Sequence, residues 1–280
     1  MKKFIAFILI PLLVLCGCDS YNKFSSEVKG ISEINNNDSS SYYPILGESS
    51  NLSEASKDSM DIWRKYIVDL ANKNKDLIFI NGPENSRNVA LTFDDGPDNK
   101  VTPKVLDILK NKGVNASFFF LGDNIDKYPE IALRTFEEGN LVLNHSTTHK
   151  DLSKLSKEDF AKEVDTTDDK IKNLIGKTPN IIRPPYGAIS NLDEYKERNL
   201  KIALWSIDTL DWSKRDKDNI LSNVTDNIRP GDIILMHTSL DTEATAEALP
   251  LIIDYLKENN FNIVTLDKLL GIPPYKSDDS

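Results

Sequence analysis

Cysteine and histidine are both scarce in this chain of 280 residues. The two cysteines, Cys16 and Cys18, lie close together at the N-terminus. The remainder of the sequence can therefore form neither an internal disulfide nor a thiolate metal site. Three histidines are available as nitrogen ligands. Any metal site in the body of the protein must be built from histidine and carboxylate side chains.

Basic residues are also outnumbered. The 34 Lys and Arg residues face 44 Asp and Glu residues, and the formal net charge is −10. Proteins that bind the phosphate backbone of nucleic acids gain affinity by replacing counterions with Lys and Arg, so we expect no nucleic-acid partner. The apolar content of 39% and the charged content of 28% exclude a polytopic membrane protein, a collagen-like chain and wholesale disorder.

The N-terminal apolar run, residues 4–15, is too short for a spanning helix, which needs about 20 residues. It follows two lysines and is typical of a secretory signal. The run ends Leu15-Cys16-Gly17-Cys18, which resembles the lipobox of bacterial lipoproteins. We expect residues 1–17 to be a lipoprotein signal peptide and Cys18 to be lipidated, which would anchor an extracytoplasmic protein in the cell membrane. The alternative is ordinary signal cleavage beside an incidental cysteine.

A polar segment and a helix precede the main domain. Ser and Asn supply 15 of the 35 residues from 19 to 53, and such a stretch cannot bury enough apolar surface to offset its chain entropy. We therefore expect residues 18–54 to be a flexible tether. Within 55–87 we expect an amphipathic helix over 55–73, packed on the main domain or else binding a partner, and then a lead-in strand. The apolar positions at helical spacing are Met60, Trp63, Tyr66, Ile67 and Leu70.

From residue 88 onward, strand-like runs alternate with helical segments. The runs are 88–95, 115–122, 141–145, 181–186, 201–208, 232–237 and 262–266. This alternation predicts an α/β fold with a parallel sheet covered by helices. Most runs are continuously apolar, which suits strands buried on both faces. No repeat or linker interrupts the pattern, so we predict one domain of about seven parallel strands over 88–272, followed by a polar tail, 273–280.

Histidine and carboxylate side chains gather at two of these strand ends. His145 and His149 stand four residues apart where the third run ends, and on a helical turn both could reach one cation. The alternative is a pair of exposed histidines without a ligand. Asp94 and Asp95 end the first run, although one of them could cap a helix instead. Two histidines and one carboxylate form a catalytic zinc set with a position open for water, and the second carboxylate can serve as base.

Three further clusters close later runs. They are Arg183-Pro184-Pro185-Tyr186-Gly187, Asp208-Thr209-Leu210-Asp211-Trp212 and Leu235-Met236-His237. Each cluster alone also fits a structural role: a rigid turn, a packed tryptophan or a loop histidine. All of them, however, fall at the carboxyl ends of predicted parallel strands, where α/β enzymes build their sites. We therefore predict a single metal-containing active site at that end of the sheet.

These five segments, in this order, resemble the polysaccharide deacetylase family, also called the NodB homology domain or carbohydrate esterase family 4. The resemblance covers about residues 88–270. It implies a distorted (β/α) barrel with fewer than eight strands and a single catalytic domain. It also implies that Asp94 is the general base, that Arg183 holds Asp94, and that Asp95, His145 and His149 bind a divalent metal. Zn²⁺ is the expected metal, with Co²⁺ as a second possibility.

The resemblance assigns the other clusters as well. It implies that the Tyr186 backbone amide forms the oxyanion hole, with Tyr186 also touching substrate. His237 is then the general acid, tuned by Asp208, and Trp212 and Leu235 line the acetyl pocket.

The implied reaction is hydrolysis of N-acetyl groups on a glycan. Because a tethered bacterial lipoprotein meets its own cell wall first, N-acetylglucosamine of peptidoglycan is the leading substrate. Poly-N-acetylglucosamine exopolysaccharide or chitin oligomers are alternatives. A catalytically silent glycan-binding lipoprotein would keep the fold and lose metal ligands, whereas this sequence retains them. We expect the protein to act as a monomer.

Overall fold

The computed structural model describes residues 41–277. Its strands are β1 (Ile78–Phe79), β2 (Asn88–Asp94), β3 (Ser117–Phe120), β4 (Leu141–Asn144), β5 (Ile181–Ile182), β6 (Lys201–Ala203), β7 (Ile207–Asp208), β8 (Ile233–His237) and β9 (Asn262–Ile263). The α-helices are α2 (Glu54–Lys73), α3 (Val101–Lys112), α4 (Gly122–Lys127), α5 (Pro129–Glu137), α6 (Lys157–Ile175), α7 (Leu192–Glu197), α8 (Asp211–Lys214), α9 (Lys217–Thr225), α10 (Glu243–Glu258) and α11 (Leu266–Leu270). Two 3₁₀ helices are η1 (Leu152–Lys154) and η2 (Pro185–Gly187).

The strands form one parallel sheet that curls into a distorted barrel. Their order is β1-β6-β5-β4-β3-β2-β8-β7, with β9 paired to the start of β2. Strands β6 and β7 lie near opposite ends of this order, yet only residues 204–206 separate them in the chain. A flat sheet of this width cannot be crossed by three residues, which reach about 10 Å. The two ends of the sheet must therefore curl toward each other, and the expected fold class is confirmed.

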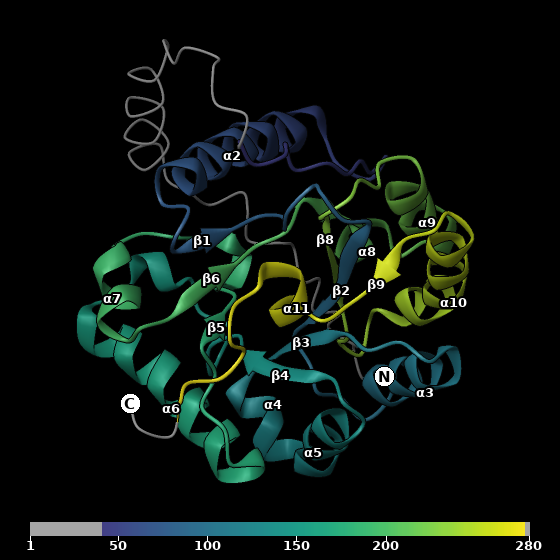
Figure 1. Ribbon diagram of the computed structural model, residues 1–280. Coiled ribbons are helices and arrows are strands. Elements are labelled where there is room, and N and C mark those ends of the chain that lie inside the picture. The colour runs from purple at the N-terminus through teal and green to yellow at the C-terminus, as the bar shows by residue number, and fades with distance from the viewer. Residues whose placement is uncertain (1–40, 278–280) are drawn as a thin grey trace, which may run out of the picture.

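Apolar side chains on both faces of the strands explain this arrangement. Phe118 and Phe120 in β3 join the core cluster that includes buried residues of α3 and α10, whereas Phe119 between them joins the cluster on the other face. Successive side chains of a strand point to opposite faces, so three consecutive phenylalanines require burial on both sides. Figure 1 shows the strands at the centre of the molecule with helices around them.

Nine strands are present in residues 41–277, compared with the seven predicted over 88–272 and the lead-in strand predicted before them. The predicted run 201–208 is broken into β6 and β7 where the chain passes from one end of the sheet to the other. Leu204 N–H donates to the Phe79 carbonyl, whereas Ser206 N–H donates to the Ile233 carbonyl. The predicted lead-in strand is β1, and it joins the sheet by pairing with β6.

Both ends of the described chain pack on the domain, and this corrects the expectation that residues 18–54 form a flexible tether throughout. In the predicted tether 18–54, Ile45 is buried, and Leu46 exchanges backbone hydrogen bonds with Ser206 and Asp208. In the predicted tail 273–280, the Tyr275 hydroxyl accepts a hydrogen bond from the Val142 N–H. Composition misled the tether prediction because a few apolar residues suffice to fix that segment on the domain. The predicted signal peptide, Cys18 and the first part of the tether lie outside the described residues.

Helix α2 corresponds to the amphipathic helix predicted over 55–73. Ser53 caps it by accepting the Ser56 N–H, and Ile67 and Ala71 are buried. The helix lies over β1 at the edge of the barrel (Figure 1). Within residues 41–277, no helix has the length and apolar character needed to cross a membrane.

The end of the barrel where the strands begin is covered by α11. Leu266 and Leu269 are buried, and the Leu266 N–H donates to Ser117 Oγ at the start of β3. Figure 1 shows α11 across the centre of the sheet in yellow. The opposite end, where the strands terminate, holds the polar clusters described next.

Candidate active site

The carboxyl ends of β2 and β8 bring the first two predicted site residues together. Asp94 is the last residue of β2, His237 is the last residue of β8, and the two are directly paired in register. The Thr238 N–H donates to the Asp94 carbonyl just beyond this pair. The predicted clustering at one end of the parallel sheet is therefore found in the structure.

Asp95, His145 and His149 form a possible metal site. One ligand atom from each residue lies within 4.8 Å of the others. Asp95 Oδ1 is 3.5 Å from His145 Nε2 and 3.3 Å from His149 Nε2. Among the described residues, this buried oxygen has no hydrogen-bond partner. A buried carboxylate oxygen facing two imidazole nitrogens matches the donor set of a catalytic zinc site.

Hydrogen bonding and burial prepare these three side chains for a cation. His145 Nδ1 lies 2.7 Å from the Arg183 carbonyl. Because a carbonyl only accepts, Nδ1 carries a proton, and Nε2 is the nitrogen that faces Asp95. Burial and then the neighbouring His145 lower the pKa of His149 to about 4. Burial alone would raise the pKa of Asp95, but contact with His145 and the charge of His237 lower it below its usual range. The set therefore offers a carboxylate and, at His149, an imidazole that is neutral near pH 7.

The backbone at two of these ligands is left-handed. Asp95 has a φ of 72° and His149 a φ of 62°. Asp and His tolerate this region better than most residues. The adjoining Gly96 is required for space, because a Cβ there would lie 2.6 Å from Thr238 Oγ1 and 2.7 Å from the Phe120 ring. The strand end can therefore turn sharply and present both aspartates.

Arg183 lies beneath the site and is fully buried. Its Nη1 donates to Asp94 Oδ1 at 2.8 Å, and its other nitrogens donate to the carbonyls of Ala203 and Leu204. Burial lowers the pKa of the guanidinium, while Asp94 raises it. The guanidinium also stacks over Phe119 at 4.2 Å. The expected contact between Arg183 and Asp94 is present, and one oxygen of Asp94 is left for other chemistry.

The turn after Arg183 carries Tyr186 on a left-handed backbone, with a φ of 61°. Its side chain is 56% exposed, and its ring packs edge-on against His149 with centroids 4.6 Å apart. Trp63 of α2 lies directly on the following Gly187, where a Cβ would approach the indole to 2.7 Å. A residue of the N-terminal helix thus supports the turn that presents Tyr186.

The hydrogen-bond partner of His237 corrects the expectation. Its Nδ1 lies 2.7 Å from Oδ1 of Asp211, not of Asp208, and its N–H donates to Asp211 Oδ2. Burial alone would lower the pKa of His237, but Asp211 beside the ring, followed by Asp95 and Asp94, raises it to about 10. The imidazolium is therefore the stable form near neutral pH.

Asp208 instead organises the local turn. Its Oδ1 accepts the Leu210 N–H at 3.0 Å and Trp212 Nε1 at 3.3 Å, and burial raises its pKa. Trp212 is half-buried, and Leu235 is almost fully buried in β8. Asp208 thus fixes the orientation of the Trp212 indole.

Sequence reasoning missed Asp211, although it lies in the same cluster as Asp208. The chain leaves β7 through Leu210, whose φ is 54°, and α8 begins at the next residue. This reversal directs the Asp211 carboxylate toward β8, where the Thr245 hydroxyl also donates to it. The sequence did show a second carboxylate, Asp211, three residues after Asp208. It did not show which of the two would face His237.

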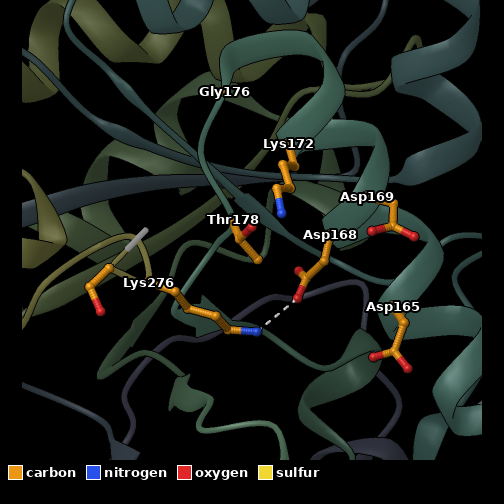
Figure 2. A pocket seen from close by; sticks show the side chains of 8 residues that line it. Asp165, Asp168, Asp169, Lys172, Gly176, Thr178 and Lys276 are labelled. Atoms are coloured by element: carbon orange, nitrogen blue, oxygen red, sulfur yellow. Dashed lines mark hydrogen bonds and ion pairs between the residues drawn. The ribbon is translucent and has the colours of Figure 1, made fainter. Parts of the chain in front are cut away.

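A separate pocket lies on the outer side of α6, away from the metal ligands. It has a volume of about 530 Å³ and is lined by Asp165, Asp168, Asp169, Lys172, Gly176, Thr178, Lys276 and Ser277. Figure 2 shows Lys276 reaching Asp168 across it, at 3.2 Å. The predicted catalytic and ligand residues do not line this pocket.

The sequence of this chain is similar to those of known polysaccharide deacetylases. The family model described as polysaccharide deacetylase matches residues 81–205. The peptidoglycan-N-acetylglucosamine deacetylase of Bacillus cereus is 41% identical over 192 residues, which cover 67% of this chain and 70% of that protein. The peptidoglycan-N-acetylmuramic acid deacetylase PdaC of Bacillus subtilis is 36% identical over 223 residues, which cover 75% of this chain but 47% of that protein.

A solved structure is similar over most of its own length. It is the Bc1960 peptidoglycan N-acetylglucosamine deacetylase in complex with 4-naphthalen-1-yl-N-oxidanyl-benzamide. It superposes with a TM-score of 0.70 at 38% identity and covers 71% of this chain and 95% of that one. The similarity therefore extends from sequence to the arrangement of the barrel.

Proposed function

The chain belongs to the polysaccharide deacetylase family and is an amide hydrolase of that family, and from this premise we propose that it removes N-acetyl groups from N-acetylglucosamine in peptidoglycan with the help of a divalent metal. The observation that carries the proposal is one constellation: Asp94, held by Arg183, stands beside the Asp95–His145–His149 cluster and opposite His237.

Asp95, His145 and His149 would hold the metal, for which Zn²⁺ suits the nitrogen and carboxylate donors and Co²⁺ is the second candidate. When bound, the cation would act as a Lewis acid that lowers the pKa of water and polarises the acetyl carbonyl. The ligand named for the solved relative is a hydroxamic acid, a class that chelates metal ions through two oxygens. This chemistry supports a metal at the equivalent place here.

Asp94 acts as general base toward the attacking water. Arg183 occupies Oδ1, whereas Oδ2 faces the metal cluster, 3.7 Å from His145 Nε2. The carboxylate is therefore oriented with one oxygen directed at the space where water and substrate meet. Positioned proton transfer of this kind contributes about 10²–10⁴-fold to rate.

His237 acts as general acid toward the leaving amine. Asp211 holds the ring through Nδ1 and favours the imidazolium, so Nε2 carries a proton toward the site. An amine leaves readily only when it is protonated. Asp94 and His237 thus stand at the ends of neighbouring strands as proton acceptor and proton donor.

The remaining side chains bind and orient the substrate. The Tyr186 amide donates to the developing oxyanion, a type of contact worth about 3 kcal/mol in other enzymes. The exposed Tyr186 ring offers an apolar face to a sugar. Trp212, oriented by Asp208, and Leu235 in β8 enclose the acetyl methyl group.

Peptidoglycan as substrate is supported by the names of the relatives, which specify N-acetylglucosamine in one case and N-acetylmuramic acid in another. We place the protein outside the cytoplasm as a monomer, anchored through lipidated Cys18 and facing the cell wall. Poly-N-acetylglucosamine and chitin oligomers are alternative substrates. The retained ligand set argues against a silent glycan-binding protein.

The test is acetate release from purified peptidoglycan, poly-N-acetylglucosamine and chitin oligomers, with Asp94→Asn as the matched inactive control. Mass spectrometry of muramidase fragments then locates the sugar that has lost its acetyl group. We expect release from peptidoglycan, mainly from glucosamine. Loss from muramic acid or faster release from another polymer would contradict the substrate, and no release at all would contradict the activity.

A further inference from the structure

The loop that carries the two histidine ligands has a demanding backbone. Both Ser146 and His149 adopt left-handed conformations, with φ of 70° and 62°. Non-glycine residues persist in this region only when surrounding contacts hold them there. The loop 145–149 therefore needs support from outside itself.

Glu163 of α6 supplies that support at the centre of the loop. Glu163 is 3% exposed, and its Oε2 accepts the N–H groups of Thr147 at 3.1 Å and Thr148 at 2.8 Å. Oε1 accepts the Thr148 hydroxyl at 2.7 Å and lies 3.1 Å from Lys150 Nζ. Burial alone would raise the pKa of Glu163, but the Thr148 and Lys150 contacts lower it. The loop is wrapped around a buried carboxylate.

The same face of α6 holds the beginning of the loop. Asn144 donates to Asp168 Oδ1 at 2.7 Å and accepts the Ser146 N–H at 2.7 Å. The Thr147 and Thr167 hydroxyls are 2.9 Å apart. On the outer side, Asp168 is paired with Lys276, as Figure 2 shows. Glu163 is the member of this face that contacts the peptides lying directly between the two ligands.

We propose that Glu163 is a positioning residue for the metal ligands: by binding the Thr147 and Thr148 peptides, its carboxylate fixes His149 relative to His145 and Asp95. The inference rests on the proposed metal-dependent function. Glu163 touches neither ligand ring in the contacts described, so it acts through the loop backbone. Removal of the Glu163 carboxylate should therefore weaken metal binding, whereas removal of a purely structural contact would lower only the stability of the fold.

The experiment compares variants of the full chain for Zn²⁺ affinity and for the melting temperature of the metal-free protein. Glu163→Ala removes the acceptors. Glu163→Gln keeps one oxygen for the two N–H groups and faces its amide toward the Thr148 hydroxyl, which can accept. Asp232→Ala is the matched control, because this buried carboxylate accepts the Arg229 N–H and the Ser206 hydroxyl at the opposite end of β8.

Zn²⁺ dissociation constants are measured by competition with a chelator of known affinity. We expect Glu163→Ala to weaken binding by about 10–100-fold, the range found when partners that orient metal ligands are removed, and Glu163→Gln to restore most of it. Asp232→Ala should lower the melting temperature and leave the affinity unchanged. Equal affinity of Glu163→Ala and wild type, or equal weakening in Asp232→Ala, would overturn the proposal.

Thr148→Val keeps the test decisive if Glu163→Ala does not fold. It deletes one exposed donor to Glu163, and we expect a smaller but measurable loss of Zn²⁺ affinity with little change in melting temperature. Unchanged affinity would overturn the positioning role. If the wild-type chain itself binds no Zn²⁺ or Co²⁺, the proposed function fails as well, and the wild-type measurement identifies that case.

Discussion

The Asp211 carboxylate binds His237 twice, through the ring Nδ1 at 2.7 Å and through the backbone N–H at 2.8 Å. The first contact favours the imidazolium, and the second fixes the strand end that carries it. Asp211 is itself 1% exposed and is held by the Thr245 hydroxyl. Both the charge and the direction of the proposed general acid therefore depend on one carboxylate.

Asp211→Asn should move the basic limb of the pH–rate profile to lower pH. Asp211 contributes most to raising the pKa of His237 to about 10, ahead of Asp95 and Asp94. A neutral amide at 211 removes that largest contribution to the stability of the imidazolium. A bound divalent cation repels the imidazolium, so the wild-type limb should lie below pH 10. Kinetics from pH 5 to 10 measure the shift. Asp208→Asn is the matched control. A larger shift in that variant would show that Asp208, as first expected, tunes His237 in place of Asp211.

The same pair should make stability depend on pH. A raised pKa in the folded state means that the contribution is fully present below about pH 6.5, the ordinary histidine value, and is lost as pH rises through about 10. The unfolding free energy of Asp211→Asn should therefore differ most from wild type near pH 6. Chemical denaturation of the metal-free proteins at both ends of this range measures the difference.

The sequence was sufficient to place most of the site because strand ends are easy to recognise. Asp94, His145 and Arg183 each follow a short apolar run, and parallel strands bring those ends together. Side-chain partners were harder to predict, because Asp208 and Asp211 differ only in how the chain turns at Leu210. That turn depends on tertiary contacts, which the pattern of residue types does not encode.

The limits of the fold prediction have a similar cause. Composition indicated a flexible tether, yet Leu46 pairs with Ile207 of β7 because the curled sheet leaves that edge open. The run 201–208 is mostly apolar between its charged ends, so the residue pattern did not reveal the break between β6 and β7. Local patterns predicted the elements, whereas closure of the barrel decided where they ended and what covered its edges.

Asp94 and Asp95 should respond differently to substitution. Asp94→Asn should retain metal and lose about 10²–10⁴-fold in kcat, because the amide keeps the shape without the basicity. Asp95→Ala should lose metal, because two histidines remain where three ligands are needed. Metal content by elemental analysis, beside kcat, separates the two roles. Equal metal content in both variants would mean that the roles are misassigned.

Arg183→Met should destabilise the fold through the charge it leaves behind. The guanidinium is fully buried and bonded to Asp94, Ala203 and Leu204. Removing one partner of a buried ion pair costs about 3–5 kcal/mol, because the other charge stays unpaired. The double variant with Asp94→Asn should recover part of this loss. Urea denaturation measures both, and a double variant no more stable than the single one would contradict the argument.

Cys18→Ala should release the protein from the membrane fraction. The expected diacylglyceryl anchor stabilises membrane binding by about 0.8 kcal/mol per buried CH₂. Immunoblots of membrane and soluble fractions measure the change, with Cys16→Ala as the matched control. Unchanged partition of Cys18→Ala would contradict the lipid anchor.

Trp63→Ala should lower kcat although Trp63 lies outside the residues matched by the family model. The indole packs on Trp205, with ring centroids 5.6 Å apart, and rests on the Gly187 backbone. Its loss opens a cavity under the turn that presents the Tyr186 amide. Because the donor shifts but remains, the loss in kcat should stay below the about 10²–10³-fold cost of removing an oxyanion donor.

Metal content should not change in Trp63→Ala, because the indole is not a ligand, and Trp63→Phe should retain part of the rate by filling part of the space. Gly187→Ala tests the same contact from the other side. The added Cβ would collide with the Trp63 indole, and the φ of +60° at this position is unfavourable for alanine. Steady-state kinetics below the melting temperature of each variant separate a displaced turn from partial unfolding. Wild-type kcat in both Trp63→Ala and Gly187→Ala would show that α2 does not support the reaction.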